Sequence, residues 1–200
     1  MSKAPSEKLD GRNSTAQIGH DGLTAEVPVI DAASGKAPDA AVARSLFHQR
    51  AGQLFLALTR LARYRDIPAG DLKSLFLQPL IDDRIAFAHR DGDGATAMPI
   101  GMAVWASVSD SVAERIAADA NANTFPVRME AQDWTSGETI WLLDLLVPDQ
   151  KAGTAVFMNF GKLIEGRSFR AHPVVWGMVD KSITDKFADL RPSAPAPNAS

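Results

Sequence analysis

The sequence predicts an α/β or α+β domain in which a central sheet is flanked by helices. Apolar residues recur at helical spacing over residues 41–63, and apolar runs of strand length follow between residues 84 and 176. In the second half of the chain, strand-like and helix-like segments alternate, which is typical of a sheet covered by helices.

Composition limits the classes of function. The chain has 200 residues, 46% of them hydrophobic, which suits one globular domain with tails. A formal net charge of -3 gives no strongly basic surface of the kind that nucleic-acid binding requires. The absence of cysteine excludes disulfides, thiolate nucleophiles and zinc–thiolate sites. No stretch resembles a signal peptide or a membrane span, so we expect a soluble cytoplasmic protein.

We expect three regions along the chain. Residues 1–40 are rich in Gly, Ala, Ser, Pro and Asp and show no sustained period, which predicts a disordered or loosely attached segment. Residues 41–190 have the size of one folded domain, and residues 191–200 read as a disordered Pro/Ala-rich tail.

A first helix is predicted over residues 41–63. One face is apolar, with side chains at three- and four-residue steps: Phe47, Ala51, Leu54, Leu58 and Leu61. The opposite face is polar, with Gln49, Gln53, Arg60 and Arg63. Pro68 ends this region because it disfavours helix at the preceding residue. A second, short helix is predicted over 71–79, with Asp71 as its N-cap.

The next segments predict a hairpin and a third helix. Residues 84–89 and 100–108 have strand character and flank an Asp-Gly-Asp-Gly turn signal at 91–94. Residues 109–120 follow with helical spacing, and Ser109 or Asp110 would cap that helix.

The last third of the chain predicts two strands, each followed by a helix. Residues 139–147 read as an interior strand closed by Pro148, and a helix is predicted over 153–164. Residues 169–176 then predict another strand, and 184–190 a final short helix. We expect Trp105, Trp134 and Trp141 to be core residues.

Asp144 is the most informative single residue, because it is a carboxylate in the middle of the apolar strand over 139–147. A buried Asp is costly unless it is hydrogen-bonded, ion-paired or used in chemistry. One reading is structural, with the carboxylate satisfied by backbone amides or by an arginine such as Arg170. The other reading is a functional site.

The same stretch resembles the signature of a known family. Residues 133–137 read Asp-Trp-Thr-Ser-Gly, and Trp141, Asp144 and Pro148 follow. This pattern resembles the RTX toxin-activating lysine acyltransferases of the haemolysin-activating type. Four weaker segments agree in order, over residues 64–68, 77–85, 99–106 and 168–171. The resemblance covers roughly residues 45–180.

The resemblance implies a GNAT-like fold with a mixed, mostly antiparallel sheet, so residues 41–190 would form an acyltransferase-like domain. It implies transfer of a fatty acyl group from acyl-acyl carrier protein to internal lysines of an RTX-type protoxin or related secreted protein, with no other cofactor and no metal. The family pairs a catalytic His with a catalytic Asp. Asp144 matches the Asp, whereas Tyr64 stands at the position of the His.

This replacement leaves the mechanism open. A tyrosine has a reference pKa near 10 and is a poor base at pH 7, but it can donate a hydrogen bond to an oxyanion or a proton to a leaving thiolate. Asp144 would then act as the base or orient the acceptor lysine. The predicted site residues are Asp144 and Tyr64, with Arg65 and Ser136 lining the site. Tyr64 as an ordinary half-buried aromatic at a helix end is the structural alternative.

Basic residues gather in the 44–73 region: Arg44, Arg50, Arg60, Arg63 and Arg65. Acyl carrier proteins are acidic, so such a face would favour their docking. A merely solvated helix face is the other interpretation of these arginines.

The resemblance also implies a possible homodimer, because some members of the family form homodimers. Two alternative functions stay open. One is a catalytically impaired relative that binds acyl carrier protein or the secreted partner without transfer, which the tyrosine at position 64 favours. The other is an enzyme that uses acyl-coenzyme A, which would need a glycine-rich phosphate loop. The loop at 147–153 contains only one glycine, which disfavours this second alternative.

Overall fold

The computed structural model describes residues 23–26, 39–90 and 97–187. In chain order the elements are β1 (Leu23–Glu26), α1 (Ala40–Arg60), α2 (Ala62–Arg65), α3 (Ala69–Ile81), β2 (Ile85–Arg90), β3 (Gly101–Val108), α4 (Asp110–Asn121), the 3-10 helix η1 (Ala131–Thr135), β4 (Thr139–Leu146), α5 (Gln150–Leu163), β5 (Phe169–Ala171), α6 (Pro173–Trp176) and α7 (Lys181–Thr184).

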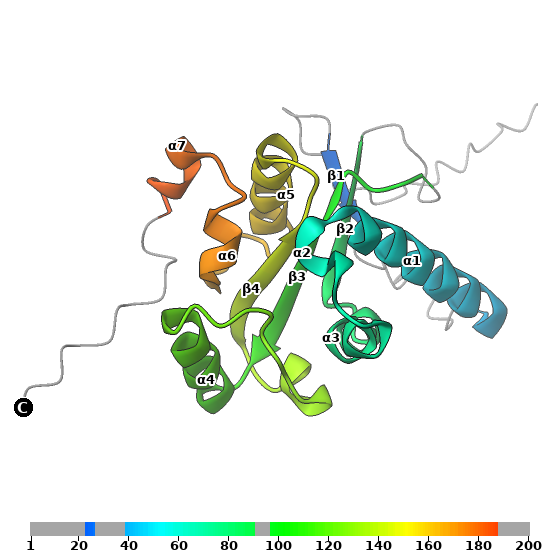
Figure 1. Ribbon diagram of the computed structural model, residues 1–200, viewed down its shortest axis with the longest axis horizontal. Helices are drawn as coiled ribbons and strands as arrows, with labels where there is room; N and C mark the ends of the chain where they lie inside the picture. Colours follow the sequence, from blue (N-terminus) through cyan, green and yellow to red (C-terminus); the bar gives the residue numbers. More distant parts are fainter. Residues whose placement is uncertain (1–22, 27–38, 91–96, 188–200) are drawn as a thin grey trace, which may run out of the picture.

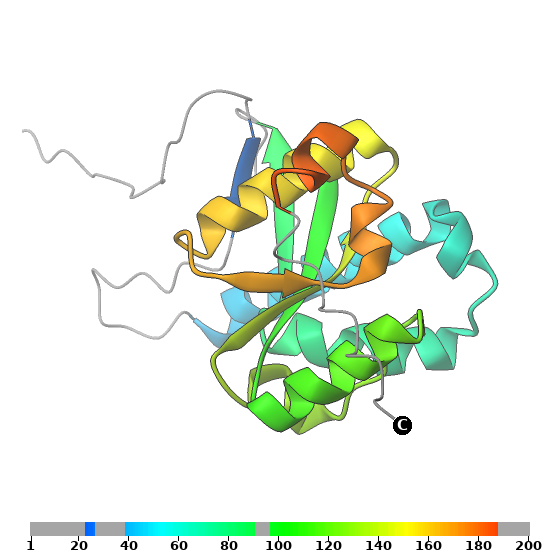
Figure 2. The same cartoon turned by 90° about the vertical axis from the view of Figure 1, so that its left-hand side faces the viewer.

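The strands form one five-stranded sheet in the order β1-β2-β3-β4-β5 (Figure 1). The first three pairings are antiparallel, and β4 pairs with β5 in parallel. Helices pack against this sheet, as the second view also shows (Figure 2). The predicted α/β (α+β) class, with a mixed and mostly antiparallel sheet flanked by helices, is therefore confirmed, and the arrangement is consistent with a GNAT-like fold.

The sheet separates two apolar cores. The first core contains side chains from α1, α3, α4 and η1, among them Leu54, Phe76, Ile116 and Trp134. The second core is built on α5 and α6, and its members include Phe157, Phe160 and Val175. We call them the α1–α3 core and the α5 core. β3 and β4 contribute to both, which explains their nearly continuous burial.

The predicted tryptophan positions are confirmed. Trp105, Trp134 and Trp141 are all buried. The paired β2 and β3 strands confirm the predicted antiparallel hairpin, while its 91–94 turn lies outside the described residues. No strand was predicted for residues 1–40, yet β1 lies there; most of that range and the whole predicted 191–200 tail also lie outside the described residues.

The predicted starts of α3 and α5 are wrong. Pro68 is the N-cap of α3, and Asp71 instead lies in the first turn. The helix predicted over 153–164 begins earlier, at Gln150, because the Asp149 carboxylate accepts a hydrogen bond from the Ala152 N–H at 2.8 Å. The predicted cap of α4 at Ser109 has the right position, although its side chain makes no capping hydrogen bond.

The strand predicted over 169–176 is also wrong beyond Ala171. Pro173 lacks the N–H that a strand needs and occupies the first turn of α6, where its fixed φ is favourable. The side chain of His172 caps this helix by accepting a hydrogen bond from the Val174 N–H at 3.3 Å. The last short helix is Lys181–Thr184 and is capped by Asp180, whereas the prediction placed it over 184–190.

In the described part of the chain, no helix has both the length and the apolar character needed to cross a membrane.

Candidate active site

The site begins with an irregularity in β4. Val104 pairs with Asp144, whereas the next residue of β3, Trp105, pairs with Leu142, so Leu143 is an extra residue in β4. Such a bulge turns two consecutive side chains to the same face. Leu143 joins the α1–α3 core, and Asp144 points to that same face instead of joining Leu142 in the α5 core. The bulge therefore aims Asp144 at α2.

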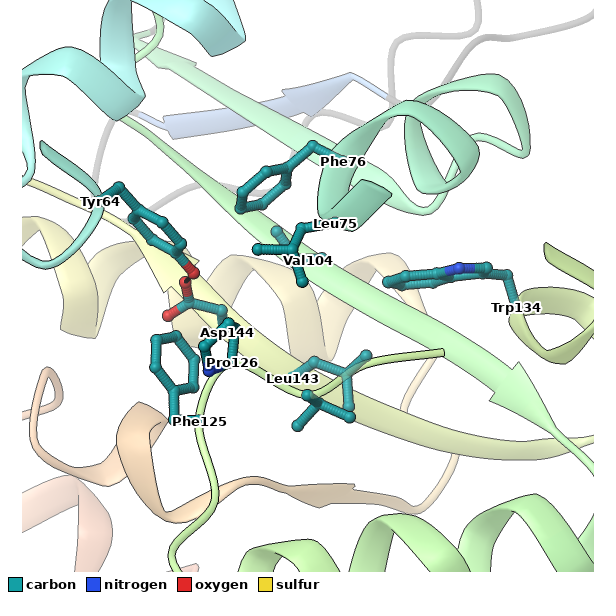
Figure 3. Close-up of a pocket in the computed structure, with 10 residues that line it drawn as sticks. Tyr64, Leu75, Phe76, Val104, Phe125, Pro126, Trp134, Leu143 and Asp144 are labelled. Carbon is teal, nitrogen blue, oxygen red and sulfur yellow. Dashed lines mark hydrogen bonds between the residues drawn. The ribbon is translucent and has the colours of Figure 1, made fainter. Parts of the chain in front are cut away.

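A break between helices aims Tyr64 at the same place. The predicted helix over 41–63 ends at Arg60, because Leu61 has extended dihedrals (φ -92°, ψ 116°), and the short α2 starts at Ala62. Tyr64 is then buried, at 3% exposure. Its hydroxyl donates a hydrogen bond of 2.6 Å to Asp144 Oδ2 (Figure 3). Its ring packs edge-on against Phe76 and Phe125.

Arg63 completes the cluster. Its Nη2 donates to Asp144 Oδ1 at 2.9 Å and to the Leu145 carbonyl oxygen at 2.6 Å. Its guanidinium also lies 5.2 Å from the centroid of the Tyr64 ring. The Leu145 N–H donates to the same Asp144 Oδ1 at 2.8 Å. Both carboxylate oxygens of Asp144 thus have donors, as a buried carboxylate requires.

Burial dominates the electrostatics of the site. Burial raises the pKa of Asp144 above its usual value, while the Arg63 charge and the hydrogen bonds from Tyr64, Arg63 and Leu145 oppose that rise. Burial also raises the pKa of the Tyr64 phenol far above its usual value, and the adjacent Asp144 charge adds to the rise. Tyr64 is therefore a neutral hydrogen-bond donor at physiological pH, not a base.

A pocket extends from this pair. Figure 3 shows Tyr64 and Asp144 at one end and Trp134 at the other. The other lining residues are all apolar: Leu75, Phe76, Val104, Phe125, Pro126, Val127 and Leu143. The cavity volume is about 20 Å³. That is space for one water molecule next to a polar pair in an otherwise apolar wall.

The Asp-Trp-Thr-Ser-Gly segment holds η1 against the end of β3. Ser136 Oγ accepts a hydrogen bond of 2.9 Å from the Ser109 N–H and donates one to the Asp133 carbonyl oxygen. The Asp133 carboxylate is paired with Arg115. Gly137 packs so closely that a Cβ there would lie 2.6 Å from the Val108 carbonyl oxygen. Except for Trp134, this motif acts as a clamp and does not line the pocket.

The predicted site residues are thus only partly brought together. Tyr64 and Asp144 are in direct contact, whereas Ser136 is exposed and belongs to the clamp. Arg65 has an exposed side chain, and the arginine that contacts the carboxylate is Arg63. Arg170, considered above as a partner for Asp144, instead lies over the Trp141 ring.

Helical spacing predicts that Arg63 and Gln53 lie on a polar outer face, and for both residues this prediction is wrong. Gln53 is buried and donates to the Ala97 carbonyl oxygen at 2.8 Å. Arg63 turns inward because the helix breaks at Leu61. The only sequence signal for its role was its position next to Tyr64.

His172 lies near the pair without joining it. It is fully buried, and its ring is 5.9 Å from that of Phe125, which in turn is 6.0 Å from that of Tyr64. Burial lowers the pKa of His172, while the charges of Asp144 and Asp119 raise it. The imidazole is therefore a neutral cap of α6, separated from the phenol by one aromatic ring.

Comparison with known proteins identifies a family for this chain. The model of a family described as the RTX toxin acyltransferase family matches residues 47–182, which include α2, the bulge of β4 and the pocket. The match covers more than half of the chain. A search of curated proteins found no match.

Proposed function

Because the chain belongs to the RTX toxin acyltransferase family, we propose that it transfers a fatty acyl group from acyl-acyl carrier protein to internal lysines of an RTX-type protoxin or related secreted protein. One observation carries the assignment of the reaction centre. It is the buried hydrogen bond between Tyr64 and Asp144 at the end of an apolar pocket. We place this chemistry in the cytoplasm, before the acceptor is secreted.

The proposed reaction begins with removal of a proton from the lysine ammonium by the Asp144 carboxylate. Burial raises the pKa of Asp144, which makes it a better base than a solvated carboxylate. The amine then attacks the thioester carbonyl, forming the C–N bond and a tetrahedral oxyanion. Collapse breaks the C–S bond, and the second proton of the amine passes to the leaving thiolate. Asp144 returns its proton to water.

Tyr64 has a different task in this proposal. Its high pKa keeps the phenol protonated, so its hydroxyl can donate a hydrogen bond to the oxyanion or relay a proton to the thiolate. In the structure that hydroxyl points at Asp144. A substrate carbonyl would compete for the same donor, which releases one oxygen of the carboxylate for the lysine.

The acyl chain requires more space than the pocket contains. A cavity of about 20 Å³ accepts one water and no fatty chain. Phe125, Pro126 and Val127 form one wall and lie in an irregular segment between α4 and η1. We propose that this segment moves outward when the acyl donor binds.

Docking of the acidic carrier would use the exposed arginines. Arg44, Arg60 and Arg65 are exposed, while Arg50 is paired with Asp83 and Arg63 with Asp144. The basic region is thus smaller than the sequence analysis expected, with three exposed arginines at the two ends of α1 and on α2. Complementary charge would raise the association rate.

A second function is favoured by the same cluster. Both oxygens of Asp144 already accept hydrogen bonds, and Tyr64 stands where the resemblance places a catalytic histidine. A relative that binds the carrier or the secreted partner without transfer would tolerate these features.

The test is a transfer assay with the full-length protein, acyl-acyl carrier protein and a lysine-containing acceptor domain, read by intact mass. The proposal expects an added acyl chain on the acceptor and its loss in Asp144→Asn. Asp185→Asn, at an exposed carboxylate of the α7 C-cap, is the matched control and should transfer normally.

One outcome would contradict the proposed transfer, and a second would contradict the role of Asp144. Binding of the carrier without any transfer would favour the second function. Full activity of Asp144→Asn would remove this carboxylate from the reaction. A higher rate in Tyr64→His would support the equivalence of that position to the family histidine.

A further inference from the structure

We propose that Arg63 is a positioning residue that fixes the orientation of the Asp144 carboxylate and keeps it ionised for the reaction. This inference rests on the proposed function, because it concerns the base of the same site. It assigns a role to a residue outside the predicted site, two positions before the predicted Arg65.

The geometry gives Arg63 control over one oxygen of the carboxylate. Its Nη2 donates at 2.9 Å to Asp144 Oδ1, the oxygen that also accepts from the Leu145 N–H. The same Nη2 donates to the Leu145 carbonyl oxygen at 2.6 Å. One guanidinium therefore connects α2 to the backbone that follows the bulge and to the carboxylate. With Oδ1 held, Oδ2 remains on the side of Tyr64 and of the pocket.

Arg63 is also the one formal positive charge paired with Asp144 in the described residues. The other groups that face the carboxylate are the Tyr64 phenol from α2 and, farther away, His172 from the N-terminus of α6. Tyr64 is neutral because its pKa is raised, and burial lowers the pKa of His172. Asp119 of α4 acts on His172 and adds negative charge only.

Ionisation of Asp144 depends on this pairing. Asp144 is buried, and burial in a low-dielectric interior favours the protonated form of its carboxyl group. A protonated Asp144 has no capacity to accept a proton from the lysine ammonium. Removing Arg63 should therefore raise the pH above which the base is ionised. An opposite charge in direct contact typically lowers the pKa of a carboxyl by about 1–3 units.

The side chain of Arg63 is 25% exposed, whereas that of Asp144 is 5% exposed. The Arg63 side chain is therefore partly open to solvent, although its Nε is buried. A glutamine or methionine at position 63 would therefore also be partly in contact with water, so we expect the variants to fold.

The experiment measures the pH dependence of kcat/KM for acyl transfer in the full chain with Arg63→Gln and Arg63→Met. Methionine retains an apolar stem against the Tyr64 ring, so it serves as the second variant if glutamine impairs folding. In both, the midpoint of the acid limb should rise by about one unit or more. Arg63→Lys keeps a charge and should restore the midpoint toward that of the wild type.

Arg60→Gln is the matched control, because Arg60 is an exposed arginine three residues away at the end of α1. Its midpoint should not move. A fall in kcat at all pH values with an unchanged midpoint in both uncharged variants would overturn the proposal, since a merely structural role gives that result.

A measurement independent of transfer separates this proposal from the proposed function. The carboxyl carbon of Asp144 can be titrated by NMR in wild type and in the uncharged variants, with its signal assigned by its loss in Asp144→Asn. A higher pKa of Asp144 without Arg63 supports the positioning role even if no transfer is found. An unchanged pKa overturns it, whether or not the protein is an enzyme.

Discussion

Removal of a single hydroxyl group, in Tyr64→Phe, tests the centre of the site. The hydroxyl donates to Asp144 Oδ2 at 2.6 Å and is the donor that the structure gives to that oxygen. The phenyl ring would retain its packing against Phe76 and Phe125. The change therefore isolates one buried hydrogen bond to a charged group, which typically contributes about 1.5–3 kcal/mol.

We expect the free energy of unfolding to fall by about 1.5–3 kcal/mol at pH 7. For a domain of this size the midpoint in urea should fall by about 1 M at unchanged m-value. Unfolding can be followed by tryptophan fluorescence, because Trp105, Trp134 and Trp141 are buried in the native state.

The matched background is Asp144→Asn, in which the acceptor has lost its charge. There the same Tyr64→Phe change should cost about 1 kcal/mol or less, as for a neutral hydrogen bond. A loss below about 0.5 kcal/mol in the wild-type background, the range of ordinary surface changes, would refute the buried charged hydrogen bond.

Three further predictions follow from the described contacts. Tyr64 is the only tyrosine of the chain, so tyrosinate absorbance reports on Tyr64 alone. Because the pKa of Tyr64 is raised by burial, this absorbance should not develop near pH 10 in the folded protein and should develop there in denaturant. A folded-state transition near pH 10 would contradict the raised pKa. In Gly137→Ala the added Cβ meets backbone atoms at 2.6 Å, so the free energy of unfolding should fall by about 1–3 kcal/mol. The control Gly161→Ala, in α5, meets nothing within 4 Å and should be neutral or stabilising. Equal effects of the two changes in denaturant melts would rule out the clamp. Because the pKa of Asp144 is raised in the folded state, the folded state binds the Asp144 proton more tightly than the unfolded state does. The free energy of unfolding of the wild type relative to Asp144→Asn should therefore fall as the pH rises above the unfolded-state pKa near 3.9. A rise in this difference with pH would contradict the raised pKa.

Several elements could be predicted from sequence because their signals are local. Helical spacing and turn residues indicated α1, α4 and the β2–β3 pair. A continuous apolar run indicated β4, which is buried on both faces. The segment after β5 was mispredicted because its apolar residues fit a strand, while Pro173 and the His172 cap decide for a helix. Residue composition alone does not rank these competing preferences.

The site shows the same division. The cost of an unpaired buried carboxylate pointed to Asp144 before any geometry was known. Its partner Arg63 was assigned to an outer face because a straight helix would place it there, and the extended Leu61 between α1 and α2 is what reverses it. The Asp-Trp-Thr-Ser-Gly motif identified the family, yet most of its side chains hold η1 to β3 and α4.

Sequence by itself determined the class of fold, the family and the presence of a carboxylate worth explaining, since these depend on residue types and on spacing along the chain. Only the tertiary structure decided what that carboxylate touches. Contacts across about eighty positions depend on one extra residue in β4 and one extended residue after α1, each of which turns a side chain through a large angle. Such local departures from regular geometry carry almost no sequence signal, because the packing on both sides of the sheet selects them.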